Sequence, residues 1–265
     1  MIRLAANLST LFTELPFIER FAAAAAAGFR GVECQFPYAV PAESVVEQLR
    51  RHELEFVLFN TPPGNVAAGE RGIAGLSGRE EEFHAGFADS LRYAAITGCP
   101  RLHVMAGIAP ADADVARQRA VFAANLAAAA DSARAHGVQL LVEPINTRVD
   151  VPGYLIDSSA AALGCIAAAN RPNVALQFDV YHLQIIEGDL ARRFVQLLPT
   201  IGHVQIADNP GRHEPGTGEI NFPWLLSRID SLGYSGWIGC EYLPAATTQA
   251  GLGWAAPYLS KRSHP

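Results

Sequence analysis

Lysine is almost absent from this chain. Of its 20 basic residues only Lys261 is a lysine, and it stands in the polar carboxyl-terminal stretch 260–265. Enzymes that form a Schiff base need a lysine amine that is desolvated in a pocket. A lysine in a polar tail does not meet that need, so the sequence argues against lysine-dependent aldolases and pyridoxal enzymes.

Closely spaced cysteines and long apolar runs are absent too. Cys34, Cys99, Cys165 and Cys240 lie far apart and form no CxxC pair, which favours neither a disulfide framework nor a zinc ribbon. No apolar run reaches the roughly 18 residues of a membrane span, and the first residues lack the apolar core of a signal peptide. We therefore expect a cytoplasmic protein with reduced thiols and no membrane partner.

The chain also lacks an excess of positive charge. Its net charge is -6, and 17% of its residues are charged. Proteins that wrap nucleic acids neutralise many phosphates with lysine and arginine, so a nucleic acid partner is not expected. Half of the residues are hydrophobic, which is enough for a large buried core.

Strand-like and helix-like segments alternate along the 265 residues. Strands are predicted at 4–8, 31–35, 55–60, 101–105, 138–143, 174–179, 201–207 and 237–241. Helices are predicted at 16–27, 42–52, 80–97, 111–136, 158–169, 190–198, 223–232 and 247–259. Eight such units without a linker predict an α/β fold, a single (β/α)8 TIM barrel domain over residues 1–265. A doubly wound open sheet is the alternative, but no GxGxxG follows the first strand.

Oxygen-bearing side chains stand where the last four predicted strands end. They are Glu143, Asp179, Gln205 and Glu241. Active sites of TIM barrels lie at this end of the strands, and a buried acid is costly unless it has a partner or a metal. Such ligands suit Mg²⁺ or Mn²⁺ better than Zn²⁺. The pattern predicts a metal site, and the alternative is four unrelated residues that cap strands or helices. Glu33 ends the second strand and is expected to hydrogen-bond to this set.

Other polar residues at the same end of the predicted barrel could bind a substrate. They are Asn7 and Asn60 at the ends of the first and third strands, His182 after Asp179, and Arg71 and Arg212 in the loops after the third and seventh strands. The arginines can pair with a carboxylate; the alternative for each is a solvated loop arginine. His182 is expected to bind a substrate oxygen, and the alternative is a surface histidine with satisfied hydrogen bonds. His203, inside the seventh strand, is either a site residue or a core histidine.

Eight segments spread over the chain together match one enzyme family. They are residues 6–9, 28–33, 67–74, 143–146, 178–182, 202–207, 214–221 and 239–242, among which 67–72 (AAGERG) and 214–219 (EPGTGE) are the most specific. With these segments the chain resembles the hydroxypyruvate isomerases and the related 2-oxo-tetronate isomerases of the xylose-isomerase-like barrels. Residues 147–150 stand where the family varies, so the resemblance does not define the role of Asp150.

The resemblance implies an isomerase that converts hydroxypyruvate to 2-hydroxy-3-oxopropanoate (tartronate semialdehyde) through an enediol. It implies that Glu143 and Glu241 are the acid/base carboxylates, and that Glu143, Asp179, Gln205 and Glu241 hold the metal. A 2-oxo-tetronate isomerase or a ketose 3-epimerase is the alternative. More distant alternatives are an endonuclease IV-like DNA repair enzyme and a non-catalytic sugar-acid binding protein. The expected partner is the small acid, and assembly into a homo-oligomer is left open.

Overall fold

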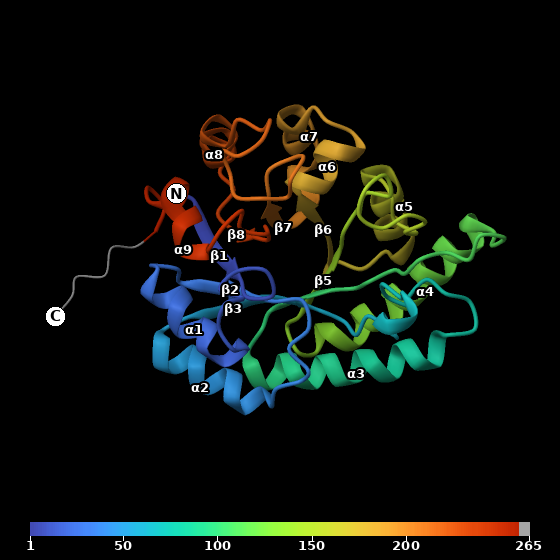
Figure 1. The fold of residues 1–265 in the computed structure, drawn as a ribbon. Coiled ribbons are helices and arrows are strands. Elements are labelled where there is room, and N and C mark those ends of the chain that lie inside the picture. The colour runs from blue at the N-terminus through green and yellow to red at the C-terminus, as the bar shows by residue number, and fades with distance from the viewer. Residues whose placement is uncertain (260–265) are drawn as a thin grey trace.

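Eight parallel strands close into a barrel (Figure 1). The structure is a computed structural model that describes residues 1–259, so the predicted tail, with Lys261, lies outside the described residues. The strands are β1 Arg3–Asn7, β2 Gly31–Glu33, β3 Glu55–Asn60, β4 Arg101–His103, β5 Gln139–Val142, β6 Val174–Asp179, β7 Ile201–Ile206 and β8 Trp237–Cys240. Each strand pairs with the next, and β8 pairs with β1. The predicted (β/α)8 TIM barrel is confirmed, and the open sheet is excluded.

Helices surround the barrel (Figure 1). They are α1 Phe17–Ala26, α2 Ala42–His52, α3 Glu80–Thr97, α4 Val115–Arg134, α5 Ser159–Ala169, α6 Val180–Ile186, α7 Leu190–Leu197, α8 Phe222–Ser231 and α9 Thr248–Gly251, with short 3-10 turns η1 Val66–Ala68, η2 Leu198–Thr200 and η3 Leu252–Ala255. Within residues 1–259, no helix combines the length and the apolar character that a membrane crossing needs.

Helix α6 was not predicted from the sequence. The predicted strand ends at Asp179 and a loop is expected after it, whereas α6 follows β6 directly. Asp179 ends the strand and caps the helix, because its Oδ1 accepts hydrogen bonds from the backbone N–H of Tyr181 at 2.7 Å and of His182 at 3.1 Å. A carboxylate at this position satisfies backbone donors that a helix start leaves free. The cap therefore aims Asp179 and His182 at the same end of the barrel.

Two other predicted helices are shorter than expected. Helix α4 begins at Val115, rather than at residue 111, because Asp114 caps it by accepting from the backbone N–H of Ala116 and Arg117. The predicted final helix over 247–259 is reduced to α9 and η3. Glycine and proline are poor helix formers, and this segment contains Gly251, Gly253 and Pro257.

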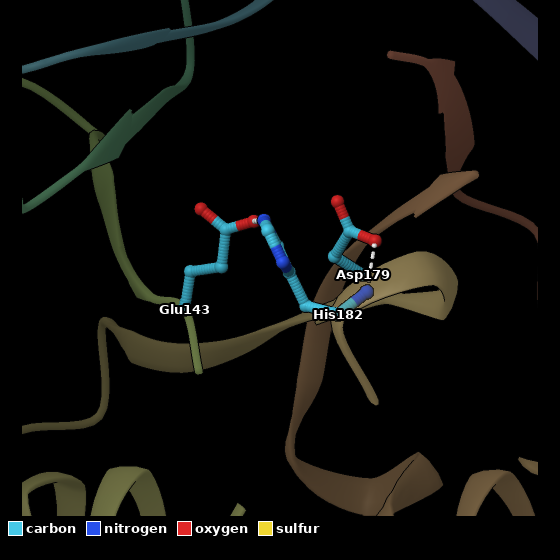
Figure 2. Close-up of side chains that lie close together, drawn as sticks. All are labelled: Glu143, Asp179 and His182. Atoms are coloured by element: carbon cyan, nitrogen blue, oxygen red, sulfur yellow. Dashed lines mark hydrogen bonds and ion pairs between the residues drawn. The ribbon is translucent and has the colours of Figure 1, made fainter. Parts of the chain in front are cut away.

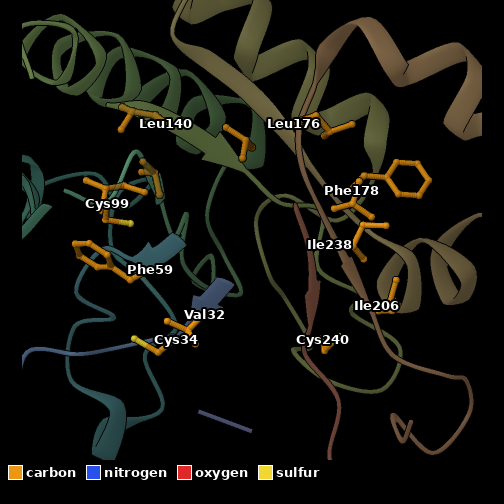
Figure 3. Packing of buried hydrophobic residues seen from close by; sticks show 14 of the residues in the cluster. Val32, Cys34, Phe59, Cys99, Leu140, Leu176, Phe178, Ile206, Ile238 and Cys240 are labelled. Carbon is orange, nitrogen blue, oxygen red and sulfur yellow. The ribbon is translucent and has the colours of Figure 1, made fainter. Parts of the chain in front are cut away.

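Apolar residues pack on both sides of the sheet. The outward side chains of the strands, among them Val32, Phe59, Leu140, Leu176, Ile206 and Ile238, are buried in one large core against the helices (Figure 3). Inside the barrel lie two small separate clusters, Ala5 with Val57 and Trp237, and Leu58 with Leu141 and Ala175. TIM barrels fill their interior with such side-chain layers. Above these layers, at the carboxyl ends of the strands, the interior is polar.

Candidate active site

Glu33 lies at the centre of the polar layer and is fully buried. Its Oε1 accepts hydrogen bonds from Asn7 Nδ2 at 3.1 Å and from Gln205 Nε2 at 2.8 Å. Its Oε2 lies 2.7 Å from Nε2 of His203. Buried carboxylates need several donors of this kind. Glu33 therefore bonds to the predicted site residues as expected, and His203 is a core histidine that supports Glu33.

Gly239 on β8 leaves the space that Glu33 occupies. A Cβ on Gly239 would lie 2.3 Å from Glu33 Oε1, which is too close for two unbonded atoms. We expect Gly239→Ala to lower the free energy of unfolding by about 1–3 kcal/mol, because overpacking would displace the Glu33 carboxylate. Urea unfolding measures this loss.

Gly164→Ala is the matched control for that substitution. A Cβ on Gly164, inside α5, meets nothing within 4 Å, and alanine is the better helix former. The control should keep or raise stability. An unchanged free energy of unfolding for Gly239→Ala would contradict the tight packing around Glu33.

Glu143, Asp179 and His182 form a buried group that could hold a metal ion. Each offers one ligand atom, and these atoms lie within 4.8 Å of one another. Figure 2 shows the two carboxyl groups beside the His182 ring, with Glu143 reaching in from the end of β5. His182 Nε2 lies 3.9 Å from Glu143 Oε1, an oxygen with no hydrogen-bond partner among the described residues. A buried carboxylate oxygen without a donor is the arrangement that a cation would satisfy.

The charges around this group favour a cation as well. Burial raises the pKa of Glu143 well above its usual value, and the negative charges of Asp179 and Glu241 raise it further. Burial also raises the pKa of Asp179, against the opposing effect of Arg212. Three buried carboxylates thus face one arginine, whose side chain is partly buried. A divalent cation would balance the remaining negative charge, so the residues present fit a metal with oxygen ligands.

Gln205, the third predicted ligand, is held in place by two side chains. Its Nε2 donates to Glu33, and its Oε1 accepts from Nε2 of Gln177. Asp179 and Gln205 stand opposite each other in the pairing of β6 with β7. Glu33 thereby fixes which way the amide faces, and the amide oxygen keeps one lone pair for a further contact.

Glu241, the fourth predicted ligand, accepts hydrogen bonds at both oxygens. Asn7 Nδ2 and Gln35 Nε2 donate to Oε1 at 3.1 and 3.0 Å, and Arg212 Nη2 donates to Oε2 at 3.1 Å. Arg212 Nη1 also donates to Asp150 at 3.0 Å, which gives Asp150 a clear role. Burial raises the pKa of Glu241 to about 7, although Arg212 opposes the shift. Arg212 is thus a paired arginine at the site and not a solvated loop residue.

A cavity of about 370 Å³ opens at this end of the barrel. It is lined by Glu143, Glu241, Asn60, Arg71, His182 and Arg212, together with Gln35, Phe36, Met105, Asp150 and His103. Four of the five predicted substrate-binding residues therefore face one space, while Asn7 acts on it through Glu241.

His103 and Gln35 line this cavity but were not predicted as site residues. The fourth strand was predicted to run to Met105, which placed His103 in its middle, whereas β4 ends at His103. If the strand had been predicted to end at His103, this titratable residue would have stood at the carboxyl end of a strand, where active sites of TIM barrels lie. Gln35 lies two residues beyond the end of β2, and its amide is brought to the site by its bond to Glu241.

Known proteins are similar to this chain in sequence. The family model described as "Xylose isomerase-like TIM barrel" matches residues 21–258. The 2-oxo-tetronate isomerase of Cupriavidus necator is 51% identical over 98% of this chain and 100% of the relative. The hydroxypyruvate isomerase of Escherichia coli is 45% identical over 97% of this chain and 100% of the relative.

A solved crystal structure is similar to this chain in fold as well as in sequence. The crystal structure described as "AP endonuclease, family 2 from Brucella melitensis" superposes with a TM-score of 0.95 and 50% sequence identity, covering 98% of this chain and 100% of that chain. The family model and these relatives each span nearly the whole chain. The chain belongs to the xylose isomerase-like TIM barrel family.

Proposed function

We propose that this protein is an isomerase of a small hydroxy-oxo acid. The observation that carries the proposal is a pair of buried carboxylates, Glu143 after β5 and Glu241 after β8, that line one cavity together with Arg71. Relatives named hydroxypyruvate isomerase and 2-oxo-tetronate isomerase support the reaction type. The substrate is hydroxypyruvate, which becomes 2-hydroxy-3-oxopropanoate, or the four-carbon 2-oxo-tetronate.

The reaction moves a hydrogen between adjacent carbons and shifts the carbonyl by one position. A carboxylate removes the proton from the carbon that bears the hydroxyl group, which leaves an enediolate. A carboxylic acid returns a proton to the neighbouring carbon, and the hydroxyl proton passes to the former carbonyl oxygen, so the atoms balance without a co-substrate. Glu143 and Glu241 carry out these two transfers. The raised pKa of Glu241, about 7, suits a group that must both take and give a proton near neutral pH.

Glu143, Asp179, Gln205 and Glu241 would hold a divalent cation, Mg²⁺ or Mn²⁺. When bound, it would supply Lewis acidity that stabilises the negative charge of the enediolate. His182 is better placed to bind the substrate than to hold the cation. Its Nδ1 lies 2.8 Å from Nδ2 of Asn146, which donates, so the imidazole proton is on Nε2. That N–H points toward the carboxylates and can donate to a substrate oxygen.

Arg71 is the arginine that we assign to the carboxylate of the substrate. Arg212 already binds Asp150 and Glu241. Arg71 lines the same cavity, and its guanidinium donates to the backbone oxygen of Glu70 at 2.8 Å without an ion pair to any residue from 1 to 259. A guanidinium with free N–H groups can bind a carboxylate through two parallel hydrogen bonds.

Arg71→Ala should raise KM for hydroxypyruvate, because a contact that is made equally in ground and transition states mainly affects binding. Activity on uncharged dihydroxyacetone should change much less. Steady-state kinetics on both substrates measures the difference. Arg79→Ala is the control, since Arg79 holds the same loop through Glu70 at 2.7 Å and should affect both substrates alike. Equal losses for Arg71→Ala on both substrates would show that Arg71 only supports the loop.

Cleavage of abasic-site DNA is the second candidate function, since the similar crystal structure is described as an AP endonuclease. The net charge of -6 disfavours binding to phosphates. A panel of hydroxypyruvate, 2-oxo-tetronate, common ketoses and an abasic-site duplex separates the two functions. We expect turnover of the oxo acids and no strand cleavage. Cleavage without isomerase activity would refute the proposal.

A further inference from the structure

His103 is a buried histidine whose ring has no hydrogen-bond partner within residues 1–259. The residue is 1% exposed, and neither ring nitrogen finds a donor or acceptor in that range. Nδ1 lies 3.4 Å from Glu143 Oε2, but this contact lacks the geometry of a hydrogen bond. Buried polar groups are rarely left without a partner, because an unmade hydrogen bond leaves the loss of hydration uncompensated. His103 lines the active-site cavity, so a bound ligand can supply the partner.

Two other donors with spare capacity stand beside His103. The side chain of Asn60, at the end of neighbouring β3, makes only a 4.0 Å contact from Nδ2 to the sulfur of Met105 within the described chain. Arg71 follows in the loop after β3. Next to it, Gly72 bridges to Ala106 just beyond β4, and a Cβ at Gly72 would lie 2.3 Å from the backbone oxygen of Met105. The loop therefore holds Arg71 close to the end of β4.

The opposite side of the cavity is unsuited to an anion. There Asp179, Glu241 and Asp150 carry the carboxylates, and Arg212 is already paired with the last two. A substrate carboxylate placed on that side would meet like charges. The side of β3 and β4 has the opposite character, since its donors are free and Arg71 brings a positive charge. An acidic substrate is thus oriented with its carboxylate toward β3 and β4.

We propose that His103 donates a hydrogen bond to the substrate carboxylate, beside Arg71. This inference rests on the proposed function, because it names a partner for the acid group of that substrate. His103 lies next to Glu143, so the carboxylate bound there is one bond away from the carbons that react. The site should therefore prefer 2-oxo acids and 2-hydroxy-3-oxo acids over acids with a more distant carboxylate.

His103→Phe tests the proposal, because it keeps a ring of similar shape and removes both nitrogens. KM for hydroxypyruvate should rise about tenfold to a hundredfold, the loss expected for a hydrogen bond to a charged group. Turnover of dihydroxyacetone should change little. Competitive inhibition by pyruvate should weaken by a similar factor, since pyruvate has the carboxylate but no hydroxyl group. His103→Gln, which keeps an N–H donor of similar reach, should restore most of the affinity.

A double-mutant cycle with Arg71→Ala adds a second measurement. If both residues bind one carboxylate, the combined loss in affinity should differ from the sum of the single losses, in free-energy terms. Provided that the wild type is active, either of two results would refute the role of His103. One is an unchanged KM for hydroxypyruvate in His103→Phe, and the other is an equal loss of activity on hydroxypyruvate and on dihydroxyacetone. A wild type that isomerises no oxo acid would instead refute the proposed function. Thermal unfolding of each variant confirms that it is folded.

Discussion

Replacing Glu143 or Glu241 by glutamine should lower kcat by at least about a hundredfold, the typical contribution of a general acid or base. Glutamine has nearly the size of glutamate but cannot take up a proton at neutral pH. Both side chains line the cavity, and Glu143 Oε1 has no hydrogen bond that the change would break within the described chain. The fold should therefore survive the substitution at Glu143. Steady-state kinetics at saturating Mg²⁺ or Mn²⁺ measures the loss.

Glu187→Gln is the matched control for these variants. Glu187 is a glutamate with little exposure that accepts from Ser159 and pairs with Arg193 at 2.7 Å, away from the cavity. Its replacement should lower the thermal stability and leave kcat unchanged. If Glu143→Gln or Glu241→Gln kept nearly normal kcat with metal present, the mechanism with two carboxylates would be wrong.

The barrel was predictable because its strands are short apolar runs, and half of them end at or next to an acidic residue. Strands β3 and β6 and helices α2 and α3 have the predicted bounds, and the other strands differ by only a few residues. Helix α6 was missed for a physical reason. Asp179 looks like a strand-end ligand in the sequence, and only its hydrogen bonds to the following backbone show that it also starts a helix.

The site was predictable only as a set of residues at one end of the barrel. Alternation of side chains indicates which residues face inward, but not which inward residues touch. The pairing of Arg212 with Glu241 joins the loop after β7 to the end of β8, and no spacing in the sequence indicates it. The isolation of the His103 ring is likewise a property of its surroundings. Such contacts depend on barrel closure and on register shifts such as the one between Leu176 and Gln177.

Asp179→Asn should weaken the binding of Mn²⁺ by at least about tenfold and lower the activity in proportion. The change removes one of the buried negative charges that favour a cation. Losing an outer partner of a metal ligand already costs about 10–100-fold in affinity, so a ligand should cost at least as much. Asparagine caps helices as well as aspartate does, so α6 should keep its start. Calorimetric titration of the chelator-treated protein measures the affinity, and adding Mg²⁺ or Mn²⁺ back should restore wild-type activity.

Asp114→Asn separates the metal effect from the capping effect. Asp114 caps α4 through Oδ1, which accepts from two backbone N–H groups, just as Asp179 caps α6, but it is not part of the group of Glu143, Asp179 and His182. The two variants should show similar thermal stability, while only Asp179→Asn loses affinity for Mn²⁺. Equal affinity in Asp179→Asn and the wild type would remove Asp179 from the ligand set. Full activity in protein shown by elemental analysis to be free of metal would remove the cation from the mechanism and leave proton transfer to Glu143 and Glu241 alone.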